Sequence, residues 1–421
     1  MANTFTRLGT ANTFDAARQT LQTRQATLAD LQAKLTEGKR VVRPSDDPTS
    51  AAQAERAQTR IARITVEQRA LETQKSAIQL GESTLGDATG LLQQFRDLLV
   101  QAGGGVNSPT ERETIAKQLV GLRDELVALA NRKDANGLPL FHGLGSTSTP
   151  FEVSADGTVP DPDYSFNGLA GQAGAGEVAI PGTLDGRATW MDVPESNGVF
   201  KVSLGAGNTG KMYTDVGLVK DAALMGSEGT DFSLSFHVDA ATGAMSYDVT
   251  NNTTGVTTTG LPYKENQTIT LGGIAMVVKG VPADGDRLEV DATVPSERPS
   301  VFGVLDRAIA GMYEPGTSTK GAASADANFN HELAISLAQV DTSLERIGAV
   351  RGRAGDLLNR ADRIHDTQED RSVQAEGDRS RAEDMDMIQG LSDFQNQQTS
   401  YQVALQTYAS IQKLSLFDFL R

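Results

Sequence analysis

The chain has 421 residues, a formal net charge of −16 and no cysteine. This length allows two or three domains, and the acidic balance argues against non-specific nucleic-acid binding through phosphates. The absence of thiols excludes disulfide scaffolds, thiolate zinc sites and cysteine nucleophiles. Hydrophobic residues are 38% of the chain and aromatic residues only 5%, which favours long helices with a modest β region over one large globular core.

The sequence also bears on targeting. No run of 18 or more apolar residues occurs, so we expect no membrane insertion. The N-terminal segment MANTFTRLGTANTFDAARQTLQ lacks the apolar stretch of a cleavable signal peptide, so we expect none. If the protein is exported, we expect it to leave the cell by another route.

The N-terminal part opens with a heptad repeat of Phe14, Leu21, Leu28 and Leu35. This spacing predicts a helix over about 11–36 that ends near Gly38. A linker follows, and we expect the next helix to begin at its end, with aspartate as the N-cap, proline at the first helical position and serine as the competing cap. The linker residues are Pro44, Ser45, Asp46, Asp47 and Pro48.

The second heptad repeat is longer and contains no proline from Thr49 to Ser108. It predicts one helix to about Gln101, whose narrow apolar seam needs another helix along its length. A capping box at 108–111 predicts a further helix. After residue 316 the chain is again free of proline and carries a similar seam, which makes it the candidate partner. The rod-seam residues are Ile64, Leu71, Ile78, Leu85, Leu92, Leu99, Leu337, Leu344, Ile347 and Leu358.

The region from about Phe141 to Arg298 has a different character, with ten of the 14 prolines between Pro139 and Pro299. Apolar and polar residues alternate over 232–238, which predicts a half-buried strand. Two apolar runs flank Gly272 and Gly273, which predicts two strands around a tight turn. We therefore expect a β-rich insert and leave its strand order open.

The predicted fold class is α+β: an elongated, discontinuous α-helical coiled-coil or bundle domain formed by both chain ends, with a β-rich domain inserted in the middle. We predict terminal assembly helices at 1–43 and 387–421, a helical rod at 44–140 and 299–386, and a β-rich variable insert at 141–298. The terminal helices are expected to bury too little surface alone and to need copies of the protein or another helical partner. The assembly-interface candidates are Phe14, Leu21, Leu28, Leu35, Phe394, Tyr401, Leu405 and Tyr408.

No constellation of residues points to catalysis. None of the four histidines has a second histidine three or four residues away, and no HExxH motif occurs. The segment 205–210 matches GxGxxG, but no helical pattern follows it, which favours a turn over a dinucleotide site. Asp46 and Asp47 form a carboxylate pair that helix capping explains without a substrate. We predict no enzyme activity, no catalytic residue, no metal site and no cofactor.

Four segments, in this order, resemble the flagellin superfamily of bacteria: 28–48, 138–143, 285–290 and 401–420. Within it, Arg43-Pro44-Ser45-Asp46-Asp47-Pro48 is similar to the flagellin-like hook-associated proteins at the junction of hook and filament. Flagellins proper carry a version that ends in Asp-Asp-Ala-Ala. The resemblance covers about 1–150 and 285–421 and leaves out the insert.

The resemblance implies a secreted, extracellular structural subunit of the bacterial flagellum, which leaves through the type III export apparatus. It implies a homo-oligomeric collar that meets the first hook-associated protein on one side and flagellin on the other. An export chaperone of the family would hold the C-terminal helix. Two alternatives stay open: a filament-forming flagellin, and an adhesin-like surface module carried by the insert.

Overall fold

The computed structural model describes residues 10–104, 108–153, 164–294, 298–313 and 322–419. The chain is helical towards both ends and β-rich in the middle, so the α+β class with helical termini is confirmed. Its contacts divide it into two compact units: unit 1 contains residues 1–69 and 365–421, and unit 2 contains residues 70–364. The long helices α2 (Pro48–Ala102) and α7 (Ala322–Glu383) contribute residues to both units.

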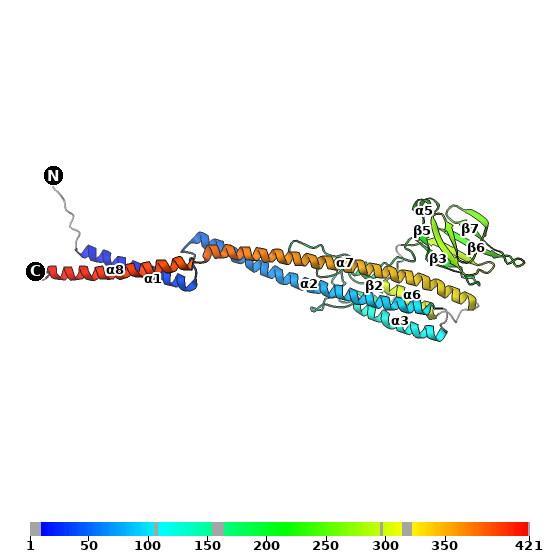
Figure 1. Cartoon of the computed structure of the whole chain (residues 1–421), viewed down its shortest axis with the longest axis horizontal. Helices are drawn as coiled ribbons and strands as arrows, with labels where there is room; N and C mark the ends of the chain where they lie inside the picture. Colours follow the sequence, from blue (N-terminus) through cyan, green and yellow to red (C-terminus); the bar gives the residue numbers. More distant parts are fainter. Residues whose placement is uncertain (1–9, 105–107, 154–163, 295–297, 314–321, 420–421) are drawn as a thin grey trace. The chain divides into compact units, whose positions relative to one another are not determined.

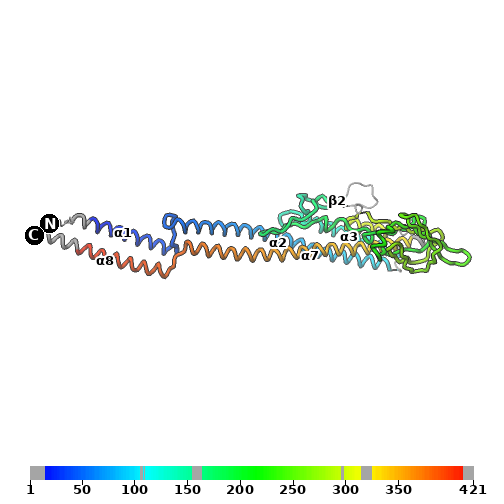
Figure 2. The backbone as a smooth tube through the Cα atoms, turned by 90° about the horizontal axis from the view of Figure 1, so that it is seen from above, coloured from blue at the N-terminus to red at the C-terminus, as the bar shows by residue number. Residues whose placement is uncertain are grey.

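The described residues of unit 1 are helical apart from its two linkers. Helix α1 (Thr10–Glu37) packs against α8 (Met387–Phe419), and the two run in opposite directions side by side in both views (Figures 1 and 2). Helix α1 ends where Gly38 adopts a φ of +71° and the Lys39 N–H donates to the Lys34 carbonyl at 3.1 Å. This left-handed residue satisfies a terminal carbonyl and turns the chain towards α2.

The helical part of unit 2 comprises α2 and α7 within 70–364, α3 (Pro109–Ala130) and α6 (Val301–Tyr313). Helix α3 begins with the predicted capping box, in which the Ser108 hydroxyl accepts from the Glu111 N–H and the Glu111 carboxylate accepts from the Ser108 N–H. Trp190, at the end of α4 (Gly186–Trp190), stacks on Phe302 with 5.6 Å between ring centroids. The heptad leucines and this aromatic cluster form one continuous core.

The β-rich part of unit 2 has its own core and contains two antiparallel sheets, with a small sheet of β1 and β2 nearer the helices. The larger sheet has the order β3-β11-β6-β7-β8, and in the second β10 pairs with β4, β5 and β9. The strand predicted over 232–238 and the two strands around Gly272 and Gly273 are confirmed as β6, β9 and β10. The remaining bounds are β1 (Phe151–Val153), β2 (Tyr164–Phe166), β3 (Phe200–Leu204), β4 (Tyr213–Thr214), β5 (Leu218–Val219), α5 (Ala222–Glu228), β6 (Phe232–Val238), β7 (Met245–Asn251), β8 (Val256–Pro262), β9 (Gln267–Leu271), β10 (Ile274–Lys279) and β11 (Arg287–Ala292).

Candidate assembly surface

The α1–α8 pair contains most of the assembly-interface candidates. Half-buried positions recur every three or four residues on both helices, as two packed helices require. On α1 they include Leu21, Leu28 and Leu35, and on α8 they include Phe394, Tyr401 and Tyr408. The side chain of Phe14 lies outside the described residues, and Leu405 is 42% exposed.

The structure thus differs from the expectation that the terminal helices lack an internal partner, because each covers one face of the other. Their contact remains thin: no described side chain of α1 is fully buried. A groove of about 520 Å³ runs between the helices, and Arg24 crosses it to donate to the Ser400 carbonyl at 3.1 Å. Gly390 lies close to α1, because an added Cβ there would be 3.1 Å from Leu35 Cδ2, and it would also be 2.6 Å from Met385 Sδ in the linker.

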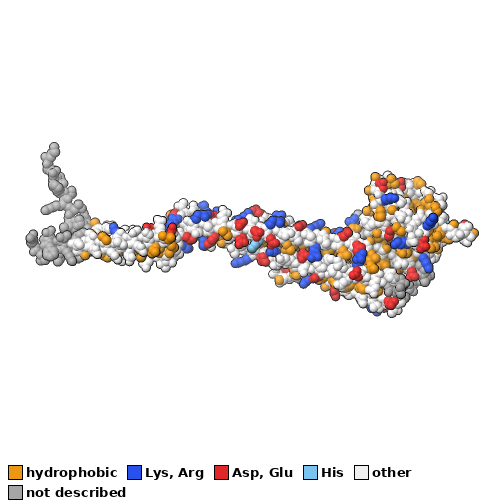
Figure 3. Space-filling view, viewed as in Figure 1, with side chains coloured by type: hydrophobic (Ala, Val, Ile, Leu, Met, Phe, Trp, Pro, Cys, Tyr) orange, Lys and Arg blue, Asp and Glu red, His pale blue; other side chains and the backbone are white. Residues whose placement is uncertain are grey.

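A second stripe on α8 faces outward and is uncharged. Its positions are spaced alternately three and four residues apart, and Ile388 is 85% exposed, Leu391 53% and Leu405 42%. Between Met387 and Ser410, Asp393 is the one charged residue in the sequence, and Figure 3 shows few charged side chains over this stretch. A heptad-spaced, uncharged and exposed stripe has the pattern on which a further helix packs. The full stripe is Ile388, Leu391, Gln395, Gln398, Gln402 and Leu405.

The two linkers of unit 1 are joined to each other by main-chain bonds. Lys39 and Asp384 form an isolated antiparallel bridge, the Arg40 N–H donates to the Glu383 carbonyl at 2.8 Å, and the Met385 N–H donates to the Gly38 carbonyl at 2.9 Å. Lys39 also pairs with the Glu383 carboxylate. We call this region, residues 38–47 with 383–386, the joint, because both chain segments pass through it between α1–α8 and α2–α7.

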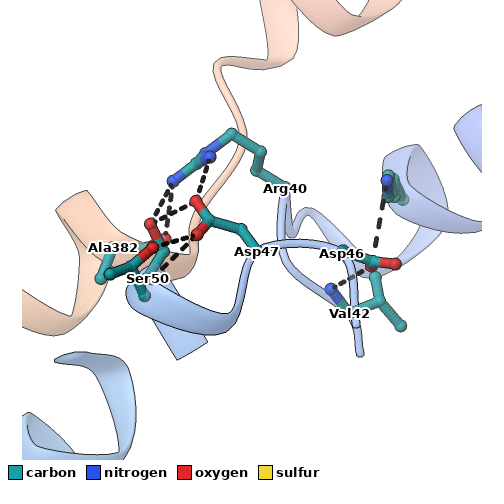
Figure 4. A network of polar contacts seen from close by, with 8 residues as sticks. Arg40, Val42, Asp46, Asp47, Ser50 and Ala382 are labelled. Atoms are coloured by element: carbon teal, nitrogen blue, oxygen red, sulfur yellow. Dashed lines mark hydrogen bonds and ion pairs between the residues drawn. The ribbon is translucent and has the colours of Figure 1, made fainter. Parts of the chain in front are cut away.

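Arg40 is the centre of the polar network in the joint (Figure 4). Its guanidinium donates to the Asp47 carboxylate at 3.2 Å, to Ser50 Oγ at 3.1 Å and to the Ala382 carbonyl at 3.0 Å. Asp47 also accepts from the Ser50 N–H at 3.1 Å, which is the predicted N-cap bond of α2. One planar side chain therefore connects the start of α2 to the end of α7.

Both carboxylates of the linker are held in the charged form by hydrogen bonds. The hydroxyl and N–H of Ser50 lower the pKa of Asp47 well below its usual range. The main-chain N–H of Arg43, with that of Val42, lowers the pKa of Asp46. These hydrogen bonds to the chain itself agree with the predicted capping role of the two carboxylates.

The rod-seam residues lie at the positions that a paired helix buries. In unit 1, Ile64 is 5% exposed, and in unit 2 the residues of α2 and Ile347 are at most 2% exposed. The other three residues of α7 are partly buried against the same core, namely Leu337, Leu344 and Leu358. Near the joint, alanines occupy the buried positions of α2 and α7: Ala54, Ala57, Ala375 and Ala382.

The loop that matches the GxGxxG motif has a structural role. The loop Gly205–Gly210 is held by Asp286, which accepts from the Thr209 and Gly210 N–H groups at 2.8 and 3.1 Å. No helix follows the loop; Tyr213 and Thr214 form the short strand β4. Within the described ranges there is no group of three or more side chains suited to hold a metal ion, and no helix is long and apolar enough to cross a bilayer.

Sequence reasoning identified the linker 44–48 but missed its long-range partners around Arg40, and it did not show which face of α8 packs against α1. The link from Arg40 to the Ala382 carbonyl spans 342 positions, so no local pattern announces it. The outer stripe of α8 could have been found from the sequence. Its residues are spaced alternately three and four positions apart, as are those of the inner seam.

Comparisons with known proteins agree with this architecture. The family described as "Bacterial flagellin N-terminal helical region" matches residues 10–146. The crystal structure of the flagellar junction protein FlgL from Legionella pneumophila is 26% identical, has a TM-score of 0.64, and covers 74% of this chain and 99% of its own. The N-terminal part of the chain is thus similar to the bacterial flagellin N-terminal region, and its fold is similar to that of a flagellar junction protein.

Curated proteins that are similar in sequence to this chain include hook-associated proteins. Flagellar hook-associated protein 3 of Salmonella typhimurium (strain LT2) is 34% identical over 154 residues, which are 36% of this chain and 48% of the relative. The protein of the same name from Escherichia coli (strain K12) is 39% identical over 121 residues, 28% of this chain and 37% of the relative. The matches span less than half the length of these two relatives.

Proposed function

We propose that this chain is a structural subunit of the bacterial flagellum that joins the hook to the filament. The observation that carries the proposal is the similarity in fold to a flagellar junction protein over 99% of that protein's length. The relatives named as hook-associated protein 3 add support from the sequence. In this proposal the chain is an adaptor and not an enzyme.

The α1–α8 pair supplies the physical basis for assembly. The pair buries little of its own surface and leaves an uncharged, heptad-spaced stripe exposed on α8. We propose the helices of 1–43 and 387–421 as the assembly elements, 44–140 and 299–386 as the rod, and 141–298 as an accessory insert. The assembly-interface candidates of α1 and α8 keep a role in this proposal because they set the geometry of the pair that presents the stripe.

The proposed partners follow from the same reading. Copies of the chain would form a collar outside the cell, between the first hook-associated protein and flagellin. Before that, an export chaperone would hold the C-terminal helix, and the chain would leave without cleavage of a signal peptide. We propose neither nucleic acid nor membrane insertion for this subunit.

A deletion strain tests the proposal. We expect cells without the protein to build hooks, to lose filaments and to release flagellin monomer into the medium, which immunoblotting and electron microscopy measure. The wild-type gene should restore filaments. Intact filaments in the deletion strain would overturn the proposed role.

A pair of matched substitutions tests the surface. Ile388→Lys places a charge on the outer stripe of α8, where the side chain is 85% exposed, and should leave folding intact while it reduces filament retention. Val256→Lys makes the same change at a 62% exposed position on β8 and serves as the control. Equal motility of the two complemented strains would contradict the role of the stripe.

A filament-forming flagellin is the second candidate, because the N-terminal match is to the flagellin family. It predicts a different phenotype for the deletion strain: intact hook junctions and no flagellin in the medium. A surface-binding role of the insert predicts that deletion of about 155–285 abolishes adhesion but leaves junction assembly intact.

A further inference from the structure

A buried histidine on α7 contacts the β-rich part of unit 2. His331 is 3% exposed. Its Nε2 lies 2.9 Å from the Val202 carbonyl oxygen in β3, and its Nδ1 lies 3.2 Å from Thr214 Oγ1 and 3.3 Å from the Thr214 carbonyl oxygen in β4. Strand β3 belongs to the five-stranded sheet and β4 to the other sheet. A single ring on a helix therefore holds one strand of each sheet.

The partners assign the protons of the neutral ring. A carbonyl oxygen only accepts, and the Val202 oxygen at 2.9 Å from Nε2 is nearer than the Thr214 carbonyl oxygen at 3.3 Å from Nδ1, so in a neutral ring Nε2 carries the hydrogen and donates it to Val202. Nδ1 is then the acceptor, and the Thr214 hydroxyl donates to it. Both bonds lie in a buried site, where losing one partner leaves the other without water to replace it.

The other polar groups beside the ring make weaker contacts. A groove of about 540 Å³ adjoins His331 and is lined by Glu195, Lys201, Arg307 and Glu332, among others. The Glu195 carboxylate is 3.8 Å from both Lys201 Nζ and Arg307 Nη1, beyond hydrogen-bond distance. Partly exposed ion pairs of this kind contribute little to a fixed geometry.

Two chain segments near this contact connect the β-rich part to the helices of unit 2, and they are hydrogen-bonded to each other. The Val193 N–H donates to the Pro299 carbonyl at 2.8 Å, and the Thr293 N–H donates to the Val199 carbonyl at 3.1 Å. These bonds join the outgoing segment to the returning one, and neither of them reaches α7. The β-rich part also has its own core, so its fold does not depend on the helix.

We propose that His331 is a latch that fixes the β-rich insert to helix α7 by binding β3 and β4 at once. When the hydrogen bonds of His331 are formed, the insert is held against α7. Without them, the core of the insert stays folded, but β3 and β4 open more often where they meet α7. The proposal concerns how the insert is attached to α7 and does not rest on the proposed flagellar function.

Hydrogen exchange of the full chain at neutral pH tests the latch. His331→Leu should raise exchange about tenfold in peptides covering 200–216, the loss expected for two buried hydrogen bonds. Peptides covering β6 and β7 should be unchanged. The matched control is His237→Leu, which removes the half-exposed histidine of β6 that pairs with Asp248, and it should leave 200–216 unaffected.

A milder variant keeps the test decisive if His331→Leu does not fold. Thr214→Val preserves the shape of the side chain and removes the hydroxyl donor to Nδ1, so it should raise exchange in 200–216 by a smaller factor. In the wild-type protein, ¹⁵N spectra of the ring should show the hydrogen on Nε2. Unchanged exchange in both His331→Leu and Thr214→Val, or a neutral ring with its hydrogen on Nδ1, would overturn the proposal.

Discussion

Truncation of Leu85 tests how closely the helices of unit 2 pack. Leu85 is fully buried in the core that also contains Ile347 of α7. Leu→Ala removes three carbon atoms, which is about 2.4 kcal/mol of transfer free energy at about 0.8 kcal/mol each. The remaining cavity adds to this loss, and we expect the free energy of unfolding to fall by about 3 kcal/mol.

Denaturant unfolding followed by tryptophan fluorescence measures this loss. Trp190 is the sole tryptophan of the sequence, and it is fully buried in the same core as Leu85. The signal therefore reports unit 2 directly. The control is Leu138→Ala, also in unit 2, where the side chain is 56% exposed and we expect a change below about 0.5 kcal/mol.

Two results of these unfolding measurements would contradict the close packing of Leu85. A loss below about 1 kcal/mol for Leu85→Ala would mean that the seam does not reach the close packing of a protein interior. Equal losses in the two variants would mean that burial does not set the cost.

Three further predictions concern other parts of the chain. Gly186→Ala would place a Cβ 2.0 Å from the Phe141 carbonyl oxygen, so we expect a loss of about 3 kcal/mol or more in the same fluorescence assay, and a neutral result would contradict this close approach. Asp286→Ala leaves three main-chain N–H groups without their acceptor, so we expect about 2–3 kcal/mol of lost stability and faster exchange over 205–210, whereas unchanged protection would argue against the role of the carboxylate. The pKa values of Asp46 and Asp47 in the folded protein are lower than the ordinary aspartate value of about 4. The two charged carboxylates therefore stabilise the fold above a pH of about 4, and this stabilisation is lost as the pH falls towards their pKa values in the folded protein. Amide protection over 40–50, corrected for intrinsic exchange, should therefore fall on acidification, and it should lose this dependence in the double Asp→Asn variant.

Sequence alone predicted the helices well because the heptad period and the geometry of a helix describe the same surface. The seven-residue repeat of α2 places Leu71, Ile78 and Leu85 on one line, and all three are buried. Start signals were equally local: Asp47 caps α2, and Ser108 with Glu111 caps α3. Within the insert, alternation identified β6, but nothing local specified that β11 would pair with β3 on one side and β6 on the other.

The candidate surface was only partly predictable for a related reason. Phe394, Tyr401 and Leu405 fit one broad three-four stripe of α8, and the sequence does not say which half of it meets α1. The structure places Phe394 and Tyr401 towards the interior of the pair and leaves Leu405 on the outside. The choice depends on contacts such as that of Leu35 with Gly390, which come from opposite ends of the chain.

The joint has a mechanical consequence. Two unbroken helices resist bending because each degree of curvature strains many main-chain bonds at once. At the joint the helices stop, and the chain is held mainly by half-exposed polar bonds around Arg40, which water can replace at small cost. Under a bending load, unit 1 should therefore yield at residues 38–47 and 383–386 before the flanking helices deform. A chain built in this way can bend at this one place while its helices stay straight.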